Sequence, residues 1–578
     1  MRESLRGAGR FVLCASLLFA ALTVALTWPL FRHPATQVLD ARSLYGPASV
    51  LVQRDINLTL WILSWDTHAL VTQPLRLFHS NILYPARWTL ATSEHMLGNV
   101  PFFAPVYLAT GNPILAHQCT LLATFVAAGL AMAAYVGYWT RDRVAALAAG
   151  CLFAFAPFRL WQLGNVHVVS IHWLPLVLLG VDLALDGRWG PGAVLLAGAT
   201  ALSSLCSYYV GYATFALAGA YAAVGALVRG RRALRGLAAL GIGLGSAALV
   251  VGLLTIPYLL LQREGVIPDR TRSEELNTLA FLSLAFLGPR GYSMYYLTPR
   301  RDGIPQFLGY AVMALAGASL VLRRRSPRAA LAAVAFTGWG LALGPVLSLA
   351  GGRQIDLPYR WLMALVPGFS AMRVPQRFGA LVTVAATALA GLAIGEIRVR
   401  LGRRAGVAIA VAVVVVALAE AHTFGIRTMP MPVGASMPPE YQWLAAHGDG
   451  GALVEVPATG MDLLRQSRTM YFSTAHWLPI ANGYSPYPPR TFTLIMEAAS
   501  HLPAADAIDR LLGVAPLRWV LLQHRLVAPA ALPLWLDAFQ KSGLRIAASF
   551  PDATILEVPP ERRAPAPPAG AAAASPSA

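Results

Sequence analysis

Long apolar runs separated by short polar joints make up most of the chain. A run of about twenty apolar residues matches the length of a helix that crosses a lipid bilayer. The runs do not alternate polar and apolar residues as the strands of an outer-membrane barrel do. We therefore predict an all-α polytopic membrane bundle of about eleven transmembrane helices. The predicted spans lie near residues 11–30, 113–138, 144–162, 168–186, 191–207, 209–228, 236–260, 306–322, 329–350, 376–396 and 405–424.

Arginine clusters give this bundle a direction. They precede the first span and follow the second, fourth, sixth, eighth and tenth spans, so they share one side if the spans alternate. Basic residues concentrate on the cytoplasmic side of membrane proteins, which predicts a cytoplasmic N-terminus and an extracytoplasmic C-terminal domain. The apolar stretch 96–110 contains Pro101 and Pro105, and counting it as a span would reverse every later cluster. We expect a dip or a juxtamembrane helix there.

Three long segments then face outward, at 31–95, 263–305 and 351–375. The first contains Trp61, Trp65 and Trp88 among mixed charges. Amphipathic, Trp-rich segments suit helices that lie in the headgroup layer, and we expect such helices in these outer loops.

The pattern changes after residue 424. A Met-Pro-Met-Pro sequence at 429–432 predicts a linker. Short apolar strands follow near 452–456, 519–523, 544–549 and 553–557, with helices near 440–446 and 533–541. This mixture predicts a small α/β domain. We divide the chain into a membrane domain (1–427), a soluble C-terminal α/β domain (428–558) and a disordered Pro/Ala tail (559–578).

Composition supports a membrane protein and excludes several other classes. Apolar residues make up 56% of the 578 residues and charged residues only 12%, against roughly a quarter in soluble domains. The net charge of +18 comes from arginines at the joints between spans, which favours topology over nucleic-acid binding. The four cysteines lie in apolar segments without metal-ligand spacing. No P-loop, HExxH, CxxC or Gly-x-Ser-x-Gly motif is present.

Carboxylates in the first outer loop are the candidate catalytic groups: Asp55, Asp40 and Glu94. A carboxylate at the membrane surface, beside a lipid substrate, can act as general base on an acceptor hydroxyl or amine. The alternative is a solvated loop acid. Asp182 is the main carboxylate within a predicted span, and we expect it to be interfacial because it lies near the inner end.

Basic residues near the outer surface are the candidate ligands for a lipid phosphate. Arg373 and Arg377 stand where the third outer segment enters the tenth span, and in a helix they would share one side. Guanidinium groups match phosphate oxygens with two hydrogen bonds. The alternative is snorkelling to ordinary headgroups. Further candidates of this kind are Arg290, His95 and His167, although histidines near span ends more often pack at the interface.

Several sequence motifs together resemble a known group of bacterial membrane proteins. These are Asp55 to Trp65, Asn81 to Pro85, Ser93-Glu94-His95, Pro367 to Gly379 and Asn482-Gly-Tyr-Ser485. The chain resembles GT-C-type glycosyltransferases, which use polyprenyl-phosphate-linked sugars, from about residue 40 to about residue 525.

The resemblance implies a catalytic acid in the first outer loop, which falls on Asp55 with Asp40 as alternate, and basic residues for the lipid phosphate, matched by Arg373 and Arg377. It implies inverting transfer to an extracytoplasmic glycan, lipid or protein. Arg54 stands where a second acid often occurs in that loop, which leaves the base and a divalent metal open; no other cofactor is implied. Two other functions stay open: a lipid or glycan transporter or flippase, and a non-catalytic assembly protein of the cell envelope.

Overall fold

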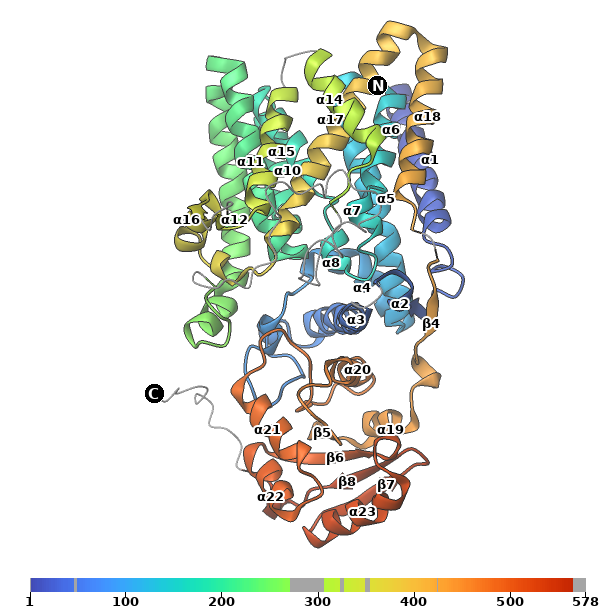
Figure 1. Ribbon diagram of the computed structural model, residues 1–578, viewed down its shortest axis with the longest axis vertical. Coiled ribbons are helices and arrows are strands. Elements are labelled where there is room, and N and C mark those ends of the chain that lie inside the picture. Colours follow the sequence, from blue (N-terminus) through green and yellow to red (C-terminus); the bar gives the residue numbers. More distant parts are fainter. Residues whose placement is uncertain are drawn as a thin grey trace.

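The computed structural model describes residues 2–45, 49–270, 306–322, 327–348, 354–423 and 425–564. Figure 1 shows a long helical bundle with the N-terminus near one end and a smaller α/β region against the opposite end. The predicted multi-pass helical fold is confirmed. Eight described stretches are long and apolar enough to cross a membrane, and one of them, Tyr208–Arg263, contains two helices. Two shorter apolar helices add Tyr310–Val321 and Arg328–Ala342.

The helices of the bundle follow the predicted spans closely. Their bounds are α1 (Arg2–Leu26), α5 (Pro113–Thr140), α6 (Arg143–Ala154), α7 (Pro157–Leu160), α8 (Val166–Val169), α9 (Leu174–Leu185), α10 (Trp189–Cys206), α11 (Tyr208–Arg229), α12 (Leu234–Arg263), α14 (Tyr310–Leu322), α15 (Arg328–Ala342), α17 (Gly379–Leu401) and α18 (Arg403–Ala421). Small residues let neighbours approach closely. A Cβ on Gly150 of α6 would lie 2.6 Å from the carbonyl oxygen of Gly129 in α5 and 2.6 Å from the ring of Phe19 in α1.

Two predicted spans are broken rather than continuous. The third divides into α6 and α7 before Pro157, and the fourth into α8 and α9. Irregular backbone at membrane depth needs internal hydrogen-bond donors. Arg159, which is fully buried, supplies them: its guanidinium donates to the carbonyl oxygens of Ala154 (2.7 Å), Thr124 (3.0 Å) and Val169 (3.1 Å).

The first outer loop forms a buried helix, which differs from the prediction. Helix α3 (Ser49–Thr72) lies across the end of the bundle, between the bundle and the α/β region (Figure 1). Trp61 and Trp65 are only 1% and 2% exposed, so they are packed inside the protein and do not face headgroups. Helix α4 (Val100–Thr110) has 11 residues, too few for a span that needs about 20, as expected for the stretch 96–110.

The C-terminal region combines a four-stranded sheet with helices, as the sequence predicts. The strands β5 (Ala452–Val456), β6 (Leu517–Gln523), β7 (Arg545–Ser549) and β8 (Ala553–Glu557) follow the order β5-β6-β8-β7. The β5–β6 pair is parallel and the other pairs are antiparallel. The helices are α19 (Pro439–His447), α20 (Leu463–Ser473), α21 (Arg490–Ser500), α22 (Ala505–Val514) and α23 (Leu532–Lys541). Helix α20 packs directly on α3. Most of the predicted tail, 565–578, lies outside the described residues.

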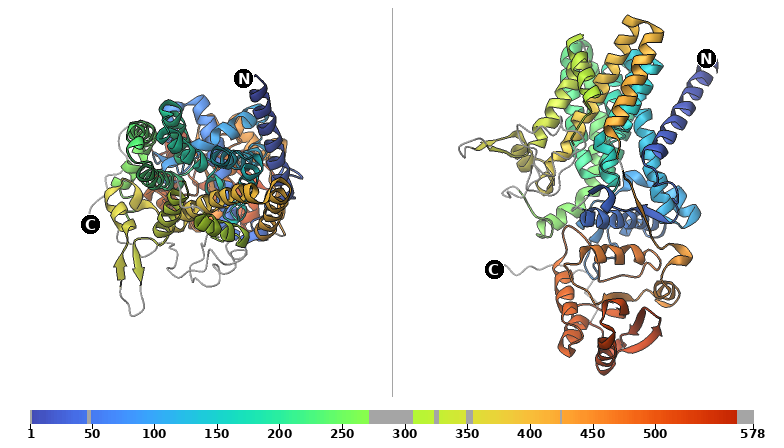
Figure 2. Two further views of the ribbon diagram at one scale, coloured as in Figure 1. Left: turned by 90° about the horizontal axis from the view of Figure 1, so that it is seen from above. Right: turned by 45° about the vertical axis from the view of Figure 1, so that its right-hand side comes forward.

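The segment expected to be a linker is paired instead. Strand β4 (Thr428–Pro430) is antiparallel to β1 (Gln37–Leu39), from the start of the first outer loop. The third outer segment also contains regular structure. Strands β2 (Val346–Ser348) and β3 (Gln354–Asp356) form a ribbon that projects from the side of the bundle in Figure 2, and helix α16 (Pro358–Leu365) follows it. The ninth span therefore ends at Ala342, earlier than predicted.

Asp182, which the sequence places near the inner end of its span, is buried between helices near the end of α9. Its side chain is 0% exposed and forms an ion pair of 2.9 Å with Arg229 at the end of α11. Tyr221 and Trp139 donate further hydrogen bonds to the same carboxylate. The arginine that the topology rule places at this joint therefore also neutralises a carboxylate inside the bundle.

Candidate functional site

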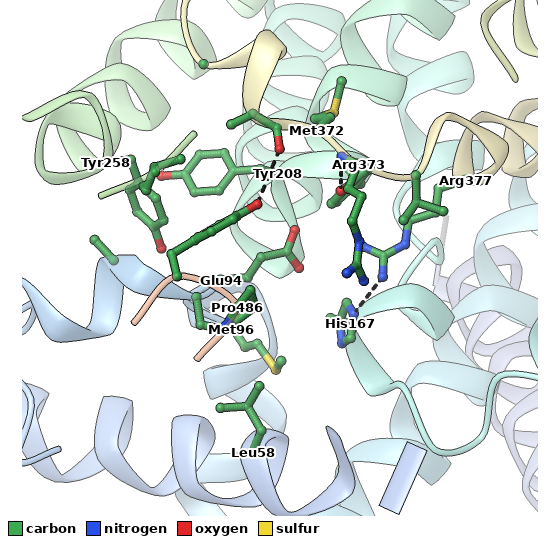
Figure 3. A pocket seen from close by; sticks show the side chains of 18 of the residues that line it. Leu58, Glu94, Met96, His167, Tyr208, Tyr258, Met372, Arg373, Arg377 and Pro486 are labelled. Carbon is green, nitrogen blue, oxygen red and sulfur yellow. Dashed lines mark hydrogen bonds between the residues drawn. The ribbon is translucent and has the colours of Figure 1, made fainter. Parts of the chain in front are cut away.

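A cavity of about 210 Å³ lies where the bundle, α3 and the α/β region meet. Its wall draws on α3, the loop that includes 91–96, helices α11 and α12, the segment 368–377, and the loop 484–487 of the C-terminal region. Figure 3 shows Arg373 and Arg377 on one side, Tyr208 and Tyr258 on the other, and Glu94 between them. Five predicted site residues line this single cavity: Asp55, Glu94, His167, Arg373 and Arg377.

Asp55 presents its carboxylate to the cavity from the first half of α3. Its side chain is 30% exposed, and Arg54 Nε lies 3.8 Å from Oδ1. The hydroxyl of Tyr484 donates to the same oxygen over 3.3 Å. Burial raises the pKa of Asp55 to about 6, against the opposing effects of Arg54, Arg377, the Tyr484 hydrogen bond and Arg373. A carboxyl with this pKa is mostly ionised at pH 7 and basic enough to accept a proton.

Arg373 and Arg377 reach the cavity without sharing a helix, contrary to the helical arrangement considered from the sequence. Pro375 begins a 3-10 turn (Pro375–Phe378), and Arg373 lies in the extended segment before it. The guanidinium carbon of Arg377 is 4.2 Å from the centre of the Tyr209 ring. Its Nη2 lies 3.4 Å from Nε2 of His167, while its Nε is buried without a partner.

Neither of these two arginines forms an ion pair within the described residues. The backbone N–H of Arg373 donates to the Tyr209 hydroxyl over 2.7 Å, which fixes its main chain and leaves its side chain exposed. Two guanidinium groups that share a cavity and form no direct ion pair with a described carboxylate suit an anionic ligand with several oxygens.

Glu94 lines the cavity but is engaged by the start of α11. Its Oε1 accepts a hydrogen bond from the Ser207 hydroxyl over 2.8 Å. Burial raises the pKa of Glu94, while Arg377, Ser207 and the backbone N–H groups of Tyr209 and Tyr208 oppose that rise. A carboxylate at a helix N-terminus satisfies N–H groups that have no partner inside the helix. Ser207 thus occupies one carboxylate oxygen of Glu94, while Oε2 is buried without a hydrogen-bond partner among the described residues, and Glu94 stays a candidate carboxylate beside Asp55.

Other predicted residues lie away from the cavity wall. Asp40 pairs with Arg42 over 2.9 Å beside the β1–β4 strand pair, and the side-chain hydrogen bond from Arg42 lowers its pKa. His95 is buried behind the wall, 3.2 Å from the Tyr208 hydroxyl, and burial lowers its pKa to about 4. Arg290 lies outside the described residues. The neutral His95 therefore supports the wall and offers no charge to a phosphate.

Sequence reasoning missed much of the wall. Tyr208, Tyr209, Tyr212, Tyr258, Tyr484 and Tyr487 all line the cavity. Arg54 and Arg270 also line it. Tyr208 and Tyr209 follow the helix break at Ser207, and two adjacent tyrosines at a span end were the available signal. Aromatic rings and hydroxyls of this kind are suited to contact a sugar through its faces and its hydroxyls.

A second buried acid supports the loop that carries Glu94. Asp66 of α3 is 0% exposed and accepts a hydrogen bond from the backbone N–H of Met96 over 3.2 Å. Burial raises the pKa of Asp66 to about 8. The N–H of His95 donates to the Tyr258 hydroxyl over 3.0 Å. Residues 94–96 are thus fixed between α3 and α12. Among the described residues, no group of three or more His, Cys, Asp or Glu side chains could hold a metal ion.

Comparisons with known proteins extend this picture. No family model matches the sequence, and no curated protein matches it. Among solved structures, the arabinofuranosyltransferase AftD from Mycobacteria matches with a TM-score of 0.59 at 16% identity, over 95% of this chain and 40% of that chain. ArnT from Cupriavidus metallidurans, bound to undecaprenyl phosphate, matches with a TM-score of 0.42 at 14% identity, over 90% of this chain and 100% of that chain.

The chain therefore spans less than half the length of the AftD chain that it matches. Over that part the two share a fold, and the GT-C-like membrane fold predicted from the sequence is confirmed.

Proposed function

We propose that this protein is an integral membrane glycosyltransferase. It transfers a sugar from a polyprenyl-phosphate donor to an extracytoplasmic glycan, lipid or protein. The observation that carries the proposal is one cavity in which the Asp55 carboxylate, the guanidinium groups of Arg373 and Arg377, which form no ion pair with any described residue, and several tyrosines meet. The fold shared with AftD, itself an arabinofuranosyltransferase, makes sugar transfer the reaction to test first.

In the proposed reaction the acceptor hydroxyl attacks the anomeric carbon of the donor sugar. Asp55 takes the hydroxyl proton as general base. The bond between the anomeric carbon and the phosphate oxygen breaks, and its electron pair leaves with the polyprenyl phosphate. Arg373 and Arg377 stabilise the negative charge that develops on this leaving group. A single direct displacement inverts the configuration of the anomeric carbon.

The location of the cavity also suits a lipid-linked donor and a water-soluble acceptor. It lies at the end of the bundle, next to spans that carry apolar side chains outward, such as Leu253 and Ile256 of α12, which are 61% and 49% exposed. A polyprenyl chain can remain in the lipid there while its phosphate reaches the arginines. Tyr484, Pro486 and Tyr487 of the C-terminal region line the cavity as well, and a water-soluble acceptor would approach from that side. The α/β region lies beyond this end of the bundle in Figure 1.

The proposed orientation places the N-terminus in the cytoplasm and the α/β region outside the cytoplasm. It rests on the arginine clusters at alternate joints. A reporter fused after residue 425 should be active only on the extracytoplasmic side. A cytoplasmic signal from that fusion would overturn the orientation.

The test of the function is an assay of the purified chain in lipid nanodiscs with a panel of polyprenyl-phosphate sugars and candidate acceptors. At least one donor should be consumed, and Asp55→Asn should lower its transfer by about 10²- to 10⁴-fold at unchanged expression. Asp40→Asn is the matched control, because Asp40 belongs to the same outer loop and lies outside the cavity. Full activity in the Asp55→Asn variant would remove Asp55 as the base.

A further inference from the structure

The loop that follows Ile480 brings the C-terminal region into contact with Asp55. Tyr484, only 5% exposed, directs its hydroxyl at Oδ1 of Asp55. Among the described residues, it is the one hydrogen-bond donor to this carboxylate. The guanidinium carbon of Arg54 lies 4.8 Å from the centre of the Tyr484 ring. Tyr484 therefore connects the C-terminal region to α3: its hydroxyl contacts Asp55 and its ring contacts Arg54.

Backbone hydrogen bonds fix this loop to the first outer loop. The N–H of Ile480 donates to Asn81 (2.6 Å), the N–H of Leu83 to Asn482 (3.1 Å), and the N–H of Tyr84 to Ile480 (3.0 Å). The approach is close, because a Cβ on Gly483 would lie 2.9 Å from the Leu83 side chain. Gly483 also has a φ of +157°, which glycine adopts more readily than other residues. The backbones of the two loops are therefore joined side by side through hydrogen bonds.

Hydrogen bonds between buried side chains also hold the C-terminal region against the first outer loop around Tyr484. Ser485 Oγ donates to the carbonyl oxygen of Thr92 over 2.5 Å. Asn57 of α3 donates to Ser467 of α20 over 3.1 Å, and Asn81 donates to Ser473 of α20 over 3.1 Å. Buried polar groups satisfied in this way specify one arrangement. The Tyr484 hydroxyl is therefore held at Asp55 by a structural unit, not by a freely moving side chain.

We infer that Tyr484 is a positioning residue for Asp55, so that the C-terminal region completes the catalytic site rather than serving only to bind substrate. The inference rests on the proposed function, because it assigns Tyr484 a role through the proposed base. The Tyr484 hydrogen bond orients the carboxylate and favours its ionised form. The lone pairs of Oδ2 remain available for the acceptor proton.

Removing the hydroxyl should change the pH at which Asp55 ionises. The charged and titratable groups facing Asp55 are Arg54 on its own helix, Arg373 and Arg377 from the segment before α17, and Tyr484. Glu94, His167 and Arg270 line the rest of the cavity. The Tyr484→Phe variant keeps all of these charges and the aromatic packing. It removes one donor to the carboxylate, so the pKa of Asp55 should rise.

The experiment compares the pH profile of kcat/KM in the wild type, Tyr484→Phe and Tyr441→Phe. In Tyr484→Phe the acid limb should move upward by about one pH unit, so that activity below the limb falls about tenfold while activity at high pH stays within about twofold. Tyr441→Phe is the matched control. It removes a buried tyrosine-to-carboxylate hydrogen bond, 2.8 Å to Glu455, in the same region but away from the cavity. Its acid limb should stay in place.

A second measurement does not depend on turnover. The infrared carboxylate band of Asp55, isolated by subtracting the spectrum of Asp55→Asn, should titrate at higher pH in Tyr484→Phe than in the wild type. An unchanged titration of that band, or an unchanged acid limb, would overturn the inference. Loss of all transfer in Asp55→Asn with an unmoved limb in Tyr484→Phe would reject Tyr484 and leave the proposed function standing. Full transfer in Asp55→Asn would instead reject the proposed base.

Discussion

The two ends of the helical bundle differ in how their arginines are paired. At the end that carries the N-terminus, carboxylates meet arginines directly: the fully buried Asp182 with Arg229 at 2.9 Å, and the partly buried Asp142 with Arg398 at 2.7 Å and Glu396 with Arg328 at 3.2 Å. At the end that faces the α/β region, Arg373 and Arg377 enter a cavity without a carboxylate partner among the described residues.

The difference separates paired charges, which can stabilise the fold without a ligand, from the arginines that we propose bind a ligand. A buried ion pair neutralises itself and needs no ligand. Arg373 and Arg377 act on Asp55 only at longer range and form no direct ion pair among the described residues, so an anion that fills the cavity can pair with both guanidinium groups. The comparison therefore predicts that substitutions at the first end alter stability and those at the second end alter ligand binding and turnover.

The largest expected effect is on stability. Arg229→Ala leaves the fully buried Asp182 without its cation and should destabilise the protein by about 3–5 kcal/mol. The measurement is the free energy of unfolding from denaturant titration in detergent. Arg232→Ala, at an exposed position of the same joint, is the control and should change little. Equal stability of both variants would break the comparison.

The next effect is on donor binding. Arg377→Ala should weaken the affinity for polyprenyl phosphate by about 10- to 150-fold, as expected for lost hydrogen bonds to a charged group. Because Arg377 forms no ion pair with any described residue, its removal breaks no direct pair among them, and thermal stability should stay near that of the wild type. Isothermal titration in nanodiscs measures the affinity. An unchanged dissociation constant would remove Arg377 from the donor site.

A smaller effect concerns pH. Burial raises the pKa of Asp55 to about 6, and a general base acts only in its deprotonated form. Transfer activity should therefore be full above that pH and fall about tenfold for each pH unit below it. A rate profile between pH 4.5 and 8 checks this, with the donor kept saturating. A profile that stays flat through pH 5 would show that Asp55 ionisation does not limit the reaction.

The smallest effect is expected at Asp40. Its partner Arg42 is 76% exposed, and pairs of this kind contribute at most about 1 kcal/mol. Asp40→Asn should change the free energy of unfolding by no more than that and leave transfer intact. A large loss of transfer in this variant would move the catalytic role from Asp55 to Asp40.

Much of the bundle follows from the sequence, because a membrane span is defined by local hydrophobicity and length. The C-terminal strands could also be predicted from the sequence, since short apolar runs bounded by turns specify them locally. The buried position of α3 was not predictable in the same way. Its Trp61 and Trp65 suggested the headgroup layer, but tertiary packing, including that of α20 on α3, places them inside the protein.

The candidate site was partly predictable for a similar reason. Residue chemistry and resemblance pointed to Asp55, Arg373 and Arg377, and the structure brings them to one cavity. The contact of Asp55 with Tyr484 joins positions 429 residues apart, and no local pattern encodes such a pairing. Gly483 was the one local sign of this contact, because a residue without a side chain is needed where the loop closely approaches Leu83.

The central claim is that the unpaired arginines of the cavity hold the phosphate of a lipid-linked sugar. A cryo-EM structure of the full chain with a polyprenyl phosphate bound in nanodiscs tests it most directly. We expect the phosphate within hydrogen-bonding distance of the Arg373 and Arg377 guanidinium groups, with the anomeric position facing Asp55. A phosphate bound elsewhere, with the cavity between these arginines and Asp55 left empty, would contradict it.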